Sequence, residues 1–531
     1  MSLQVQNLSY IHPNKDVLFS NISFSIHHGE KCAIIGNNGI GKSTLLQIIA
    51  GHIPSSSGIV QCQTTYLIPQ HFGQFNNRTI AEVLGVSEKL KALASILEGR
   101  GVEDDFNTLG DDWTIEEQMA DSFSKWGINY LSPDTLIGNL SGGEKTKVFL
   151  SGIDLHCPDM VLMDEPTNHL DSKGRATLYD YVGKSGQTIL LVSHDRALLN
   201  MLTSIYEMTS TGMRFYPMNY QSYKTLRDTE SEALAMQLHN KQKELSKIKK
   251  TARDTIERQQ KHNARGEKRS EKKCVARIAM GNLNDRAETT TSHINKVHEE
   301  KLQAMSKELS ELRSSIPVQF GMKISIDESK LHFGKRQIEM KEVLFSYPHG
   351  VSLWQKSPLN LSISVGDRIR LSGDNGCGKS TLLKLITQEL SPTSGNIWIA
   401  ESLDILYLDQ EYSFINNDLS VYKQLESDNP NLPEHELKAL LNRFLFTTSA
   451  WDKKCGDLSG GEKMKLALCC LLAHKKAPNM IIADEPTNNV DIMNTDILAS
   501  TLSNYNGTLL VVSHDEQFVK DIGINKTILL N

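Results

Sequence analysis

The 531-residue sequence contains no apolar run that approaches the roughly 18 residues needed for a membrane-spanning helix. Its first residues, MSLQVQNLSY, have neither the basic region nor the apolar core of a secretion signal. The eight cysteines are scattered without a Cys-x-x-Cys pair, so neither a disulfide framework nor a zinc site is predicted. These absences favour a cytoplasmic protein, and the length predicts two or more globular domains.

The most informative feature that is present is an internal repeat. The segments GNNGIGKS at 36–43 and GDNGCGKS at 373–380 both match G-x-x-x-x-G-K-[ST], and each leads into an apolar helical pattern. The first follows the apolar run 32–35, and the second follows Arg370-Leu371-Ser372. Glycines let backbone N–H groups turn around phosphate oxygens, and the helix N-terminus adds the positive end of its dipole. We therefore predict two phosphate-binding loops. Their residues are Gly36, Asn37, Asn38, Gly39, Ile40, Gly41, Lys42, Ser43 and Thr44 in the first, and Gly373, Asp374, Asn375, Gly376, Cys377, Gly378, Lys379, Ser380 and Thr381 in the second.

Within these loops, the motif predicts a separate role for the lysine and for the serine that follows it. Lys42 and Lys379 reach the β- and γ-phosphates of a bound nucleotide, while Ser43 and Ser380 hold Mg²⁺. The sequence thus predicts ATP and Mg²⁺ as the cofactors of both halves.

An apolar strand pattern that ends in an Asp-Glu pair also occurs twice, at Asp164-Glu165 and at Asp484-Glu485. The first carboxylate of each pair is predicted to serve the Mg²⁺ site and the second to accept a proton from the attacking water. A buried strand that merely ends in a capping Asp-Glu pair is the structural alternative.

A histidine follows each glutamate after 29 residues, as His194 and as His514, inside Val-Ser-His-Asp. Each lies after another apolar strand pattern, at the end of a sheet where ligands bind. A lone histidine is usually structural, but the repeated spacing favours a catalytic role for both.

A Leu-Ser-Gly-Gly-Glu segment opens a helical pattern at 140–144 and again at 458–462. It has the composition of an anion-binding turn, although an ordinary polar N-cap has the same composition. With this segment the chain resembles the ATP-binding cassette (ABC) superfamily, in which it is the signature loop and two α/β P-loop cassettes pack head to tail. The resemblance implies two composite ATP sites, one formed by Lys42 with Ser459, Gly460 and Gly461, and the other by Lys379 with Ser141, Gly142 and Gly143.

The resemblance also assigns two further pairs of residues. Gln70 and Gln410 match the glutamines that contact Mg²⁺ and the attacking water. Tyr10 and Tyr347, each 32 residues before a P-loop lysine, match the aromatic side chain that stacks on adenine. A tyrosine that only ends a strand is the structural alternative for this pair. We expect ATP hydrolysis at both sites.

The acidic pairs continue as Glu-Pro-Thr-Asn at 165–168 and at 485–488, which resembles the ABC-F subfamily of twin-cassette proteins that work on the ribosome. The second copy departs with Asn489-Val490, where His-Leu or Asn-Leu is usual. Valine is a mild apolar replacement, so this difference puts little of the resemblance in doubt.

The stretch between the two repeats predicts two antiparallel helices with a basic tip. Apolar residues from Leu234 to Ile256 recur at helical spacing, as do those from Leu302 to Leu312. The segment 241–277 holds 14 Lys or Arg against 5 Asp or Glu, in a chain of net charge −6. Such a tip is typical of contact with a phosphate backbone, although a solvated coiled coil is the alternative. The predicted RNA-binding residues are Arg265, Lys268, Arg269, Lys272 and Lys273.

The predicted architecture is α/β, with two tandem ABC-type P-loop cassettes at 1–225 and 317–531 and a basic helical hairpin at 226–316. The first cassette carries a short arm insertion at about 86–113. The resemblance implies a cytoplasmic monomer whose linker contacts ribosomal RNA and the P-site tRNA, either as a translation factor or as a protein that protects ribosomes from antibiotics. The ATP-binding subunit of a membrane transporter is the alternative, and it gives the basic hairpin no role.

Overall fold

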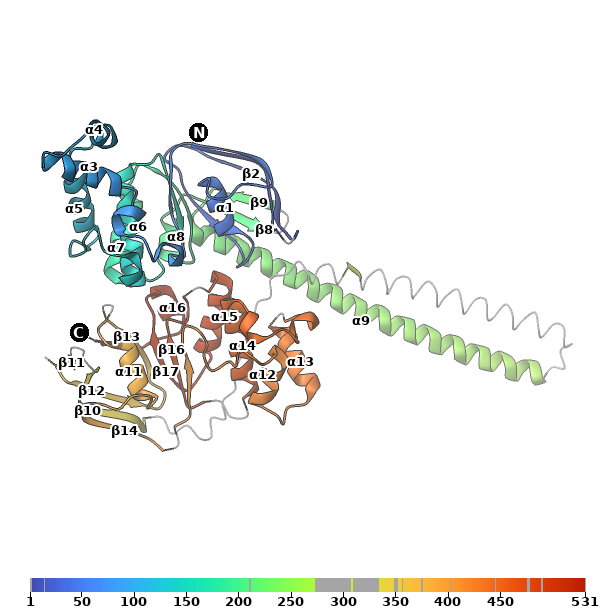
Figure 1. Cartoon of the computed structure of the whole chain (residues 1–531). Coiled ribbons are helices and arrows are strands. Elements are labelled where there is room, and N and C mark those ends of the chain that lie inside the picture. The colour runs from blue at the N-terminus through green and yellow to red at the C-terminus, as the bar shows by residue number, and fades with distance from the viewer. Residues whose placement is uncertain are drawn as a thin grey trace. The chain divides into compact units, whose positions relative to one another are not determined.

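The computed structural model describes residues 2–13, 15–209, 212–272, 307–308, 334–347, 352–355, 357–373, 376–401, 403–444, 446–474, 478–488 and 490–530. The chain divides into two compact units, of which one comprises Met1–Tyr220 with Phe320–Asn531 and the other Gln221–Gln319. The first unit contains both repeats, and the second contains the segment between them (Figure 1).

The first repeat is built on a six-stranded sheet in the order β5-β6-β7-β3-β8-β9. Neighbours in this sheet run parallel except for the antiparallel pair β8 and β9. The strands are β3 (Lys31–Ile35), β5 (Thr65–Ile68), β6 (Met160–Asp164), β7 (Thr188–Val192), β8 (Ser204–Thr209) and β9 (Gly212–Tyr216). Every residue of β6 and β7 is buried, as expected for central strands covered on both faces.

The second repeat has a parallel sheet with the same connectivity, in the order β15-β16-β17-β13-β18. The strands are β13 (Arg368–Ser372), β15 (Ile405–Leu408), β16 (Met480–Asp484), β17 (Thr508–Val512) and β18 (Lys526–Leu529). In both repeats the strand that precedes the glycine-rich loop lies between two others. The loop therefore opens at the carboxyl edge of the sheet, where the acidic strands β6 and β16 also end.

Each repeat also has an antiparallel sheet that encloses a hydrophobic core with the helix after the glycine-rich loop. The first repeat uses β1 (Leu3–Ile11), β2 (Val17–Ile26) and β4 (Ser57–Cys62) around α1 (Lys42–Ile49). The second uses β10 (Arg336–Ser346), β11 (Ser352–Leu353), β12 (Leu359–Ser364) and β14 (Ser394–Ile399) around α11 (Lys379–Ile386). This packing fixes α1 and α11 with their N-termini at the loops.

The remaining helices of each repeat follow the same order. The first repeat has α2 (Ile80–Val83), α5 (Ile115–Lys125), α6 (Gly142–His156), α7 (Ser172–Lys184) and α8 (Arg196–Asn200). The second has α12 (Val421–Asp428), α13 (Glu434–Arg443), α14 (Gly460–Ala473), α15 (Ile492–Ser503) and α16 (Glu516–Asp521). The fold class predicted from the sequence, two tandem α/β cassettes, is thereby confirmed.

Within 86–113, where the sequence predicts a short arm, the first repeat has two extra helices, α3 (Ser87–Leu97) and α4 (Glu103–Leu109). They pack on each other beside α5 (Figure 1). The side chains of Leu97, Phe106 and Trp113 are exposed there.

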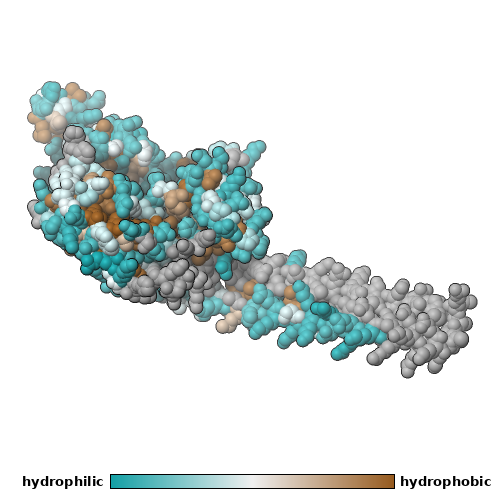
Figure 2. Space-filling model, turned by 90° about the horizontal axis from the view of Figure 1, so that it is seen from below, coloured by the Kyte–Doolittle hydropathy of each residue, from teal (hydrophilic) through white to brown (hydrophobic). Residues whose placement is uncertain are grey.

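The second unit contains most of α9 (Tyr220–Lys272), whose 53 residues correspond to about 80 Å of helix. Leu234, Leu238, Leu245 and Ile248 are half-buried along it, whereas most of its other described side chains are exposed and polar. The described part of α9 accordingly has a mostly hydrophilic surface (Figure 2). The predicted second helix lies outside the described residues except at 307–308, which are helical. Among the described helices, none combines the length and the apolar character that crossing a bilayer needs.

Candidate ATP-binding and hydrolysis sites

Both glycine-rich loops lead into their helix through a glycine that no other residue could replace without strain. Gly41, the N-cap of α1, has φ 101°, and a Cβ there would lie 2.8 Å from Leu18 Cδ2. Gly378, the N-cap of α11, has φ 96°, and its Cβ would lie 2.8 Å from Trp354 Cζ2. The left-handed conformation and the tight packing both require glycine. They allow the first N–H groups of each helix to face the loop, as phosphate binding requires.

The P-loop lysines fold back over the carbonyl oxygens of their own loops. Lys42 Nζ donates hydrogen bonds to Gly36 O at 2.7 Å and to Asn37 O at 3.0 Å. Lys379 Nζ donates equivalently to Gly373 O at 2.7 Å. Burial lowers the pKa of Lys42, whereas the charges of Glu165, Asp491 and Asp164 oppose that shift.

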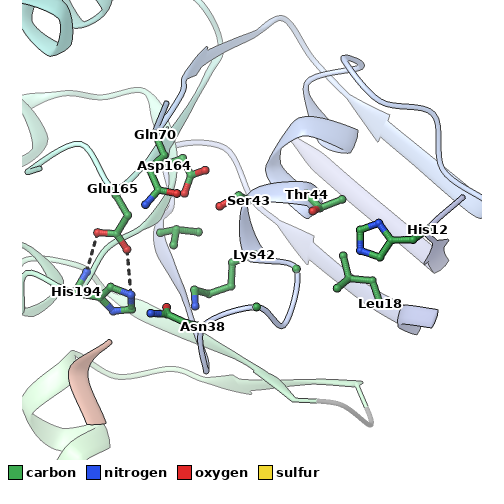
Figure 3. Close-up of a pocket in the computed structure, with 13 residues that line it drawn as sticks. His12, Leu18, Asn38, Lys42, Ser43, Thr44, Gln70, Asp164, Glu165 and His194 are labelled. Atoms are coloured by element: carbon green, nitrogen blue, oxygen red, sulfur yellow. Dashed lines mark hydrogen bonds and ion pairs between the residues drawn. The ribbon is translucent and has the colours of Figure 1, made fainter. Parts of the chain in front are cut away.

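The first cavity, of about 330 Å³, has all its lining residues in the first cassette. Figure 3 shows Ser43, Gln70 and Asp164 grouped on one side of Lys42, with Glu165 facing His194. The lining residues are His12, Leu18, Asn38, Gly39, Gly41, Lys42, Ser43, Thr44, Gln70, Asp164, Glu165, Val192 and His194. Of the predicted loop residues, Gly36 and Asn37 serve as acceptors for Lys42, and Ile40 packs against the core.

The second cavity, of about 640 Å³, is lined by residues of both cassettes. Ser141, Gly142 and Gly143, at the start of α6, lie on the same cavity as Lys379. The other lining residues are His169, Leu170, Arg175, Tyr347, Leu353, Gly376, Gly378, Ser380, Thr381, Gln410, Asp484, Glu485, Asn488, Val512 and His514. Asp374 and Asn375 lie outside the described residues, and the Cys377 carbonyl accepts a hydrogen bond from Trp354 Nε1.

The structure therefore brings together one of the two predicted pairings of P-loop and signature loop. The two signature helices begin alike, because Ser141 caps Glu144 N and Ser459 caps Glu462 N in matching capping boxes. Ser459, Gly460 and Gly461, however, are not among the residues that line the Lys42 cavity. The two sites thus differ in their surroundings although their motifs are the same.

The glutamates after β6 and β16 are held in an unusual backbone conformation. Glu165 has φ 50° and Glu485 has φ 47°, a left-handed region that costs a non-glycine residue energy. Each backbone N–H still bonds to the neighbouring strand, at Val192 O (2.8 Å) and Val512 O (2.9 Å). The chain therefore turns sharply away from the sheet at this residue, and the carboxylate of Glu165 faces the cavity (Figure 3). Strain of this kind is typical of functional sites.

Each glutamate is in contact with the histidine predicted to work with it. Glu165 accepts a hydrogen bond from His194 N at 3.2 Å, and its other oxygen lies 3.3 Å from His194 Nε2. In the second cassette, His514 Nε2 lies 3.4 Å from Glu485 Oε1. The same spacing of 29 residues has therefore produced the same contact twice.

Burial shifts the pKa values of these residues towards their uncharged forms. It raises the pKa of Glu165 to about 8, with the charge of Asp164 adding to the shift. It raises the pKa of Glu485 to about 7, although the positive charge of Arg175 opposes this. The pKa of His194 falls to about 3 and that of His514 to about 4, also mainly through burial. A carboxyl group with a pKa near neutrality suits general-base catalysis.

The carboxylates Asp164 and Asp484 fit a divalent cation. Asp164 Oδ1 is buried with no hydrogen-bond partner among the described residues, and Ser43 bonds to the same carboxyl group. Asp484 Oδ2 accepts hydrogen bonds from Ser380 Oγ at 3.4 Å and from the Tyr407 hydroxyl at 3.3 Å. In the described part of the chain, no group of three or more His, Cys, Asp or Glu residues could hold a metal ion. Mg²⁺ is usually bound by one or two carboxylates together with phosphate oxygens.

The two predicted adenine-stacking tyrosines lie in different environments. Tyr347 lines the second cavity, and its hydroxyl lies 3.1 Å from Thr381 Oγ1. Tyr10 is half-buried against Phe19 and does not line the first cavity, which has His12 instead. The rings of Tyr10 and His12 are edge-to-face, 5.4 Å apart. Alternation along a strand could have indicated His12, because residues two apart share a face.

Sequence reasoning also missed Leu353, Asn488 and Val512 of the second cavity, and three lining residues that come from the other cassette, His169, Leu170 and Arg175. These last three follow Glu-Pro-Thr-Asn in the first cassette but line the cavity of the second, so no spacing within one repeat could have indicated them. Among the predicted RNA-binding residues, Lys273 lies outside the described residues. The side chains of Arg265, Lys268, Arg269 and Lys272, in the last turns of α9, also lie outside what the structure describes.

Comparison with known proteins agrees with this geometry. The ABC transporter family profile matches residues 19–168 and 357–488. The ATP-binding protein YdiF of Bacillus subtilis is 30% identical over 98% of this chain and 79% of its own length. ABC transporter F family member 5 of Arabidopsis thaliana is 28% identical over 99% of this chain and 74% of its own length. The ATP-binding protein Uup of Buchnera aphidicola is 29% identical over 98% of this chain and 79% of its own length.

Among solved structures, an archaeal ribosome recycling factor, in complex with a ribosomal stalk protein, superposes with a TM-score of 0.59 at 16% identity. The alignment covers 98% of this chain and 87% of that one. At this identity, the likeness shows the twin-cassette fold alone. The chain belongs to the ABC family of ATPases and, within it, to the twin-cassette ABC-F subfamily. ABC ATPase domains bind and hydrolyse ATP, usually with Mg²⁺.

Proposed function

We propose that this protein is a ribosome-associated ABC-F ATPase in which ATP hydrolysis at two sites drives a conformational switch on the ribosome. The observation that carries the proposal is the shared cavity of the second site, where the signature loop of one cassette and the P-loop of the other line the same space. A nucleotide between them would bind both cassettes at once, so binding and release would alter how the cassettes are held together.

In this proposal each site divides its work among the same residue types. The P-loop backbone, Lys42 and Lys379 bind the phosphates. Ser43, Gln70 and Asp164 hold Mg²⁺ in the first site, as Ser380, Gln410 and Asp484 do in the second. The metal ion supplies charge neutralisation at the phosphates.

The chain's own contribution to the chemistry is to position water and remove its proton. Glu165 and Glu485 each accept that proton, because their buried carboxyl groups lie at the cavity with a pKa near neutrality. His194 and His514 fix the orientation of these carboxylates through the contacts at 3.3 and 3.4 Å. His12 and Tyr347 contact the nucleobase.

The proposed route to the ribosome is the linker. The segment 241–277, with 14 Lys or Arg against 5 Asp or Glu, would contact ribosomal RNA and the P-site tRNA. Relatives along the whole chain include two members of the plant ABC-F family, which supports a shared architecture. We further propose that the protein is a cytoplasmic monomer and acts either as a translation factor or in antibiotic protection.

Sedimentation with ribosomes tests the proposal. The double variant Glu165→Gln with Glu485→Gln keeps the shape of both side chains but removes the base, so it should retain ATP and comigrate with ribosomes in a sucrose gradient. The same variant with ADP, and the wild type with ATP, are the controls and should comigrate less. Recovery of the trapped variant only with membranes would favour the transporter alternative and overturn the proposal.

The role of the linker is tested in the same assay by charge reversal at Arg265, Lys268, Arg269, Lys272 and Lys273. Ribosome binding should weaken. The slope of log affinity against log salt concentration should also become shallower by about 0.7–0.9 for each phosphate contact removed. Reversal at the exposed Lys184, Lys423 and Lys520, which lie in the cassettes outside the segment 241–277, is the control for a change of charge away from the linker. A drug-susceptibility panel on cells that express the wild type would then separate translation factor from resistance protein.

A further inference from the structure

Arg175 is a residue of the first cassette that reaches the site of the second. It lies on α7, four residues after Asp171, and only 14% of its side chain is exposed. Its Nη1 donates a hydrogen bond to the backbone oxygen of His514 at 3.4 Å, while its Nε donates to Leu170 O at 3.3 Å. The guanidinium thus connects the turn after the first acidic strand to the histidine turn of the opposite cassette.

The same side chain lines the cavity that contains Lys379, Glu485 and His514. Its charge is balanced partly by Asp195 of its own cassette, with Nη1 3.8 Å from Asp195 Oδ2. Asp195 is also bonded to the backbone N–H groups of Ala197 and Leu198, so it does not depend on Arg175 for partners. The first cassette therefore holds the Arg175 guanidinium in place, and the guanidinium lies at the cavity of the second cassette.

In the part of the chain that the structure describes, no lysine or arginine of the second cassette lines the Lys42 cavity. Asp491 corresponds to Asp171 in the repeat, so the residue that corresponds to Arg175 is Thr495. Thr495 is 4% exposed, and its hydroxyl bonds to Asp491 O at 3.0 Å within its own cassette. Asp491, an acid of the second cassette, lies close enough to act on the charge of Lys42.

We propose that Arg175 is a positioning residue of the Lys379 site, supplied in trans, which holds the His514 turn in its working place and makes the two ATP sites unequal. The inference rests on the proposed catalytic roles of Glu165 and Glu485. It goes beyond them, because it makes turnover at the Lys379 site depend on the hydrogen bond from Arg175 to His514, which exists only while the cassettes are together.

The physical reason is that a cation already fixed at the edge of the cavity can stabilise the transition state without having to move during the reaction. Because His514 contacts Glu485, a shift of the His514 backbone displaces the residue that orients the base. A guanidinium at this place also stabilises negative charge that develops on the phosphates. Both effects disappear when the cassettes separate, so turnover at the Lys379 site follows their association.

Single-site variants give the test. Glu165→Gln leaves turnover at the Lys379 site, and Glu485→Gln leaves turnover at the Lys42 site. Adding Arg175→Ala should lower kcat roughly 10- to 100-fold in the first background, with little change in KM, and less than about twofold in the second. Arg175→Lys, which keeps a cation and a donor for His514 O, should restore a substantial part of the loss.

The matched control is Lys184→Ala, which removes an exposed cation from the same helix and should leave both backgrounds unchanged. Equal losses in the two backgrounds, or no loss at the Lys379 site, would overturn the proposal, as would a failure of Arg175→Lys to rescue. Undiminished turnover in the double Glu→Gln variant with Arg175 intact would instead refute the roles of the glutamates. The single-site comparison would then be made with Lys42→Ala and Lys379→Ala.

Discussion

Arg196, a buried arginine of the first cassette, contacts the second cassette, and the effect of its removal can be calculated. Arg196 is 6% exposed, and it extends from the start of α8 to two carboxylates of the second cassette. Its Nη1 lies 2.8 Å from Asp521 Oδ2, and its Nη2 contacts Asp496. At the corresponding position of the second cassette stands Glu516, which pairs with Arg370 of its own cassette at 2.8 Å. The contact therefore occurs on one side only.

The magnitude follows from the exposure of the partners. Removing one member of a fully buried ion pair costs about 3–5 kcal/mol, whereas exposed pairs contribute about 0.2–1 kcal/mol. The side chains of Asp496 and Asp521 are 37% and 33% exposed, so water can solvate them when Arg196 is lost. We expect an intermediate cost of about 1–3 kcal/mol, which corresponds to a 5- to 150-fold shift in the equilibrium between joined and separated cassettes.

Energy transfer between dyes on exposed positions of the two cassettes measures this equilibrium. Arg196→Ala should increase the ratio of separated to joined molecules by the factor above, and Arg214→Ala, which removes an exposed arginine on β9, is the control. A double-mutant cycle of Arg196→Ala with Asp521→Ala isolates the pair and should give a coupling energy of about 0.5–3 kcal/mol. A coupling energy near zero, or an unchanged population in Arg196→Ala, would refute the reasoning.

Two further predictions concern the Lys42 site. Gly41→Ala should reduce ATP binding there strongly, because it places a Cβ 2.8 Å from Leu18 Cδ2 at φ +101°, a conformation that alone costs about 1–2 kcal/mol. Gly39→Ala, where nothing lies within 4 Å of the added Cβ, is the milder comparison in a fluorescent-ATP titration. His12→Ala should weaken ATP binding severalfold by removing a stacking surface, which is worth about 1–3 kcal/mol for a base on an aromatic ring. Unchanged affinity in the same titration would place the nucleobase elsewhere.

Much of the local chemistry of each cassette could be predicted because it depends on residues close together in sequence. A glycine-rich loop between an apolar strand and a helix has few conformations open to it, so the arrangement of Gly41 and Lys42 follows from the motif. The contact between Glu165 and His194 was equally accessible. Both lie at the carboxyl ends of adjacent parallel strands, β6 and β7, which meet at one edge of the sheet.

The aromatic residue that lines the first cavity, His12, could not be chosen from the sequence with the same ease. Tyr10 and His12 lie on the same face near the end of one strand, and only the packing against Phe19 decides which ring reaches the cavity. Motif spacing carries no information about such a contact, because it depends on how three separate elements meet.

The sequence by itself determined that the chain has two P-loop cassettes, which glutamate and histidine come together in each, and that a long charged helix follows the first cassette. Only the tertiary structure decided that the two sites differ. One cavity is lined by both cassettes and receives Arg175, whereas the other is lined by its own cassette alone. The physical reason is that a repeat in sequence fixes the chemistry within each half, while contacts between the halves depend on single residues, such as Arg175 and Thr495 or Arg196 and Glu516, at which the repeat is broken.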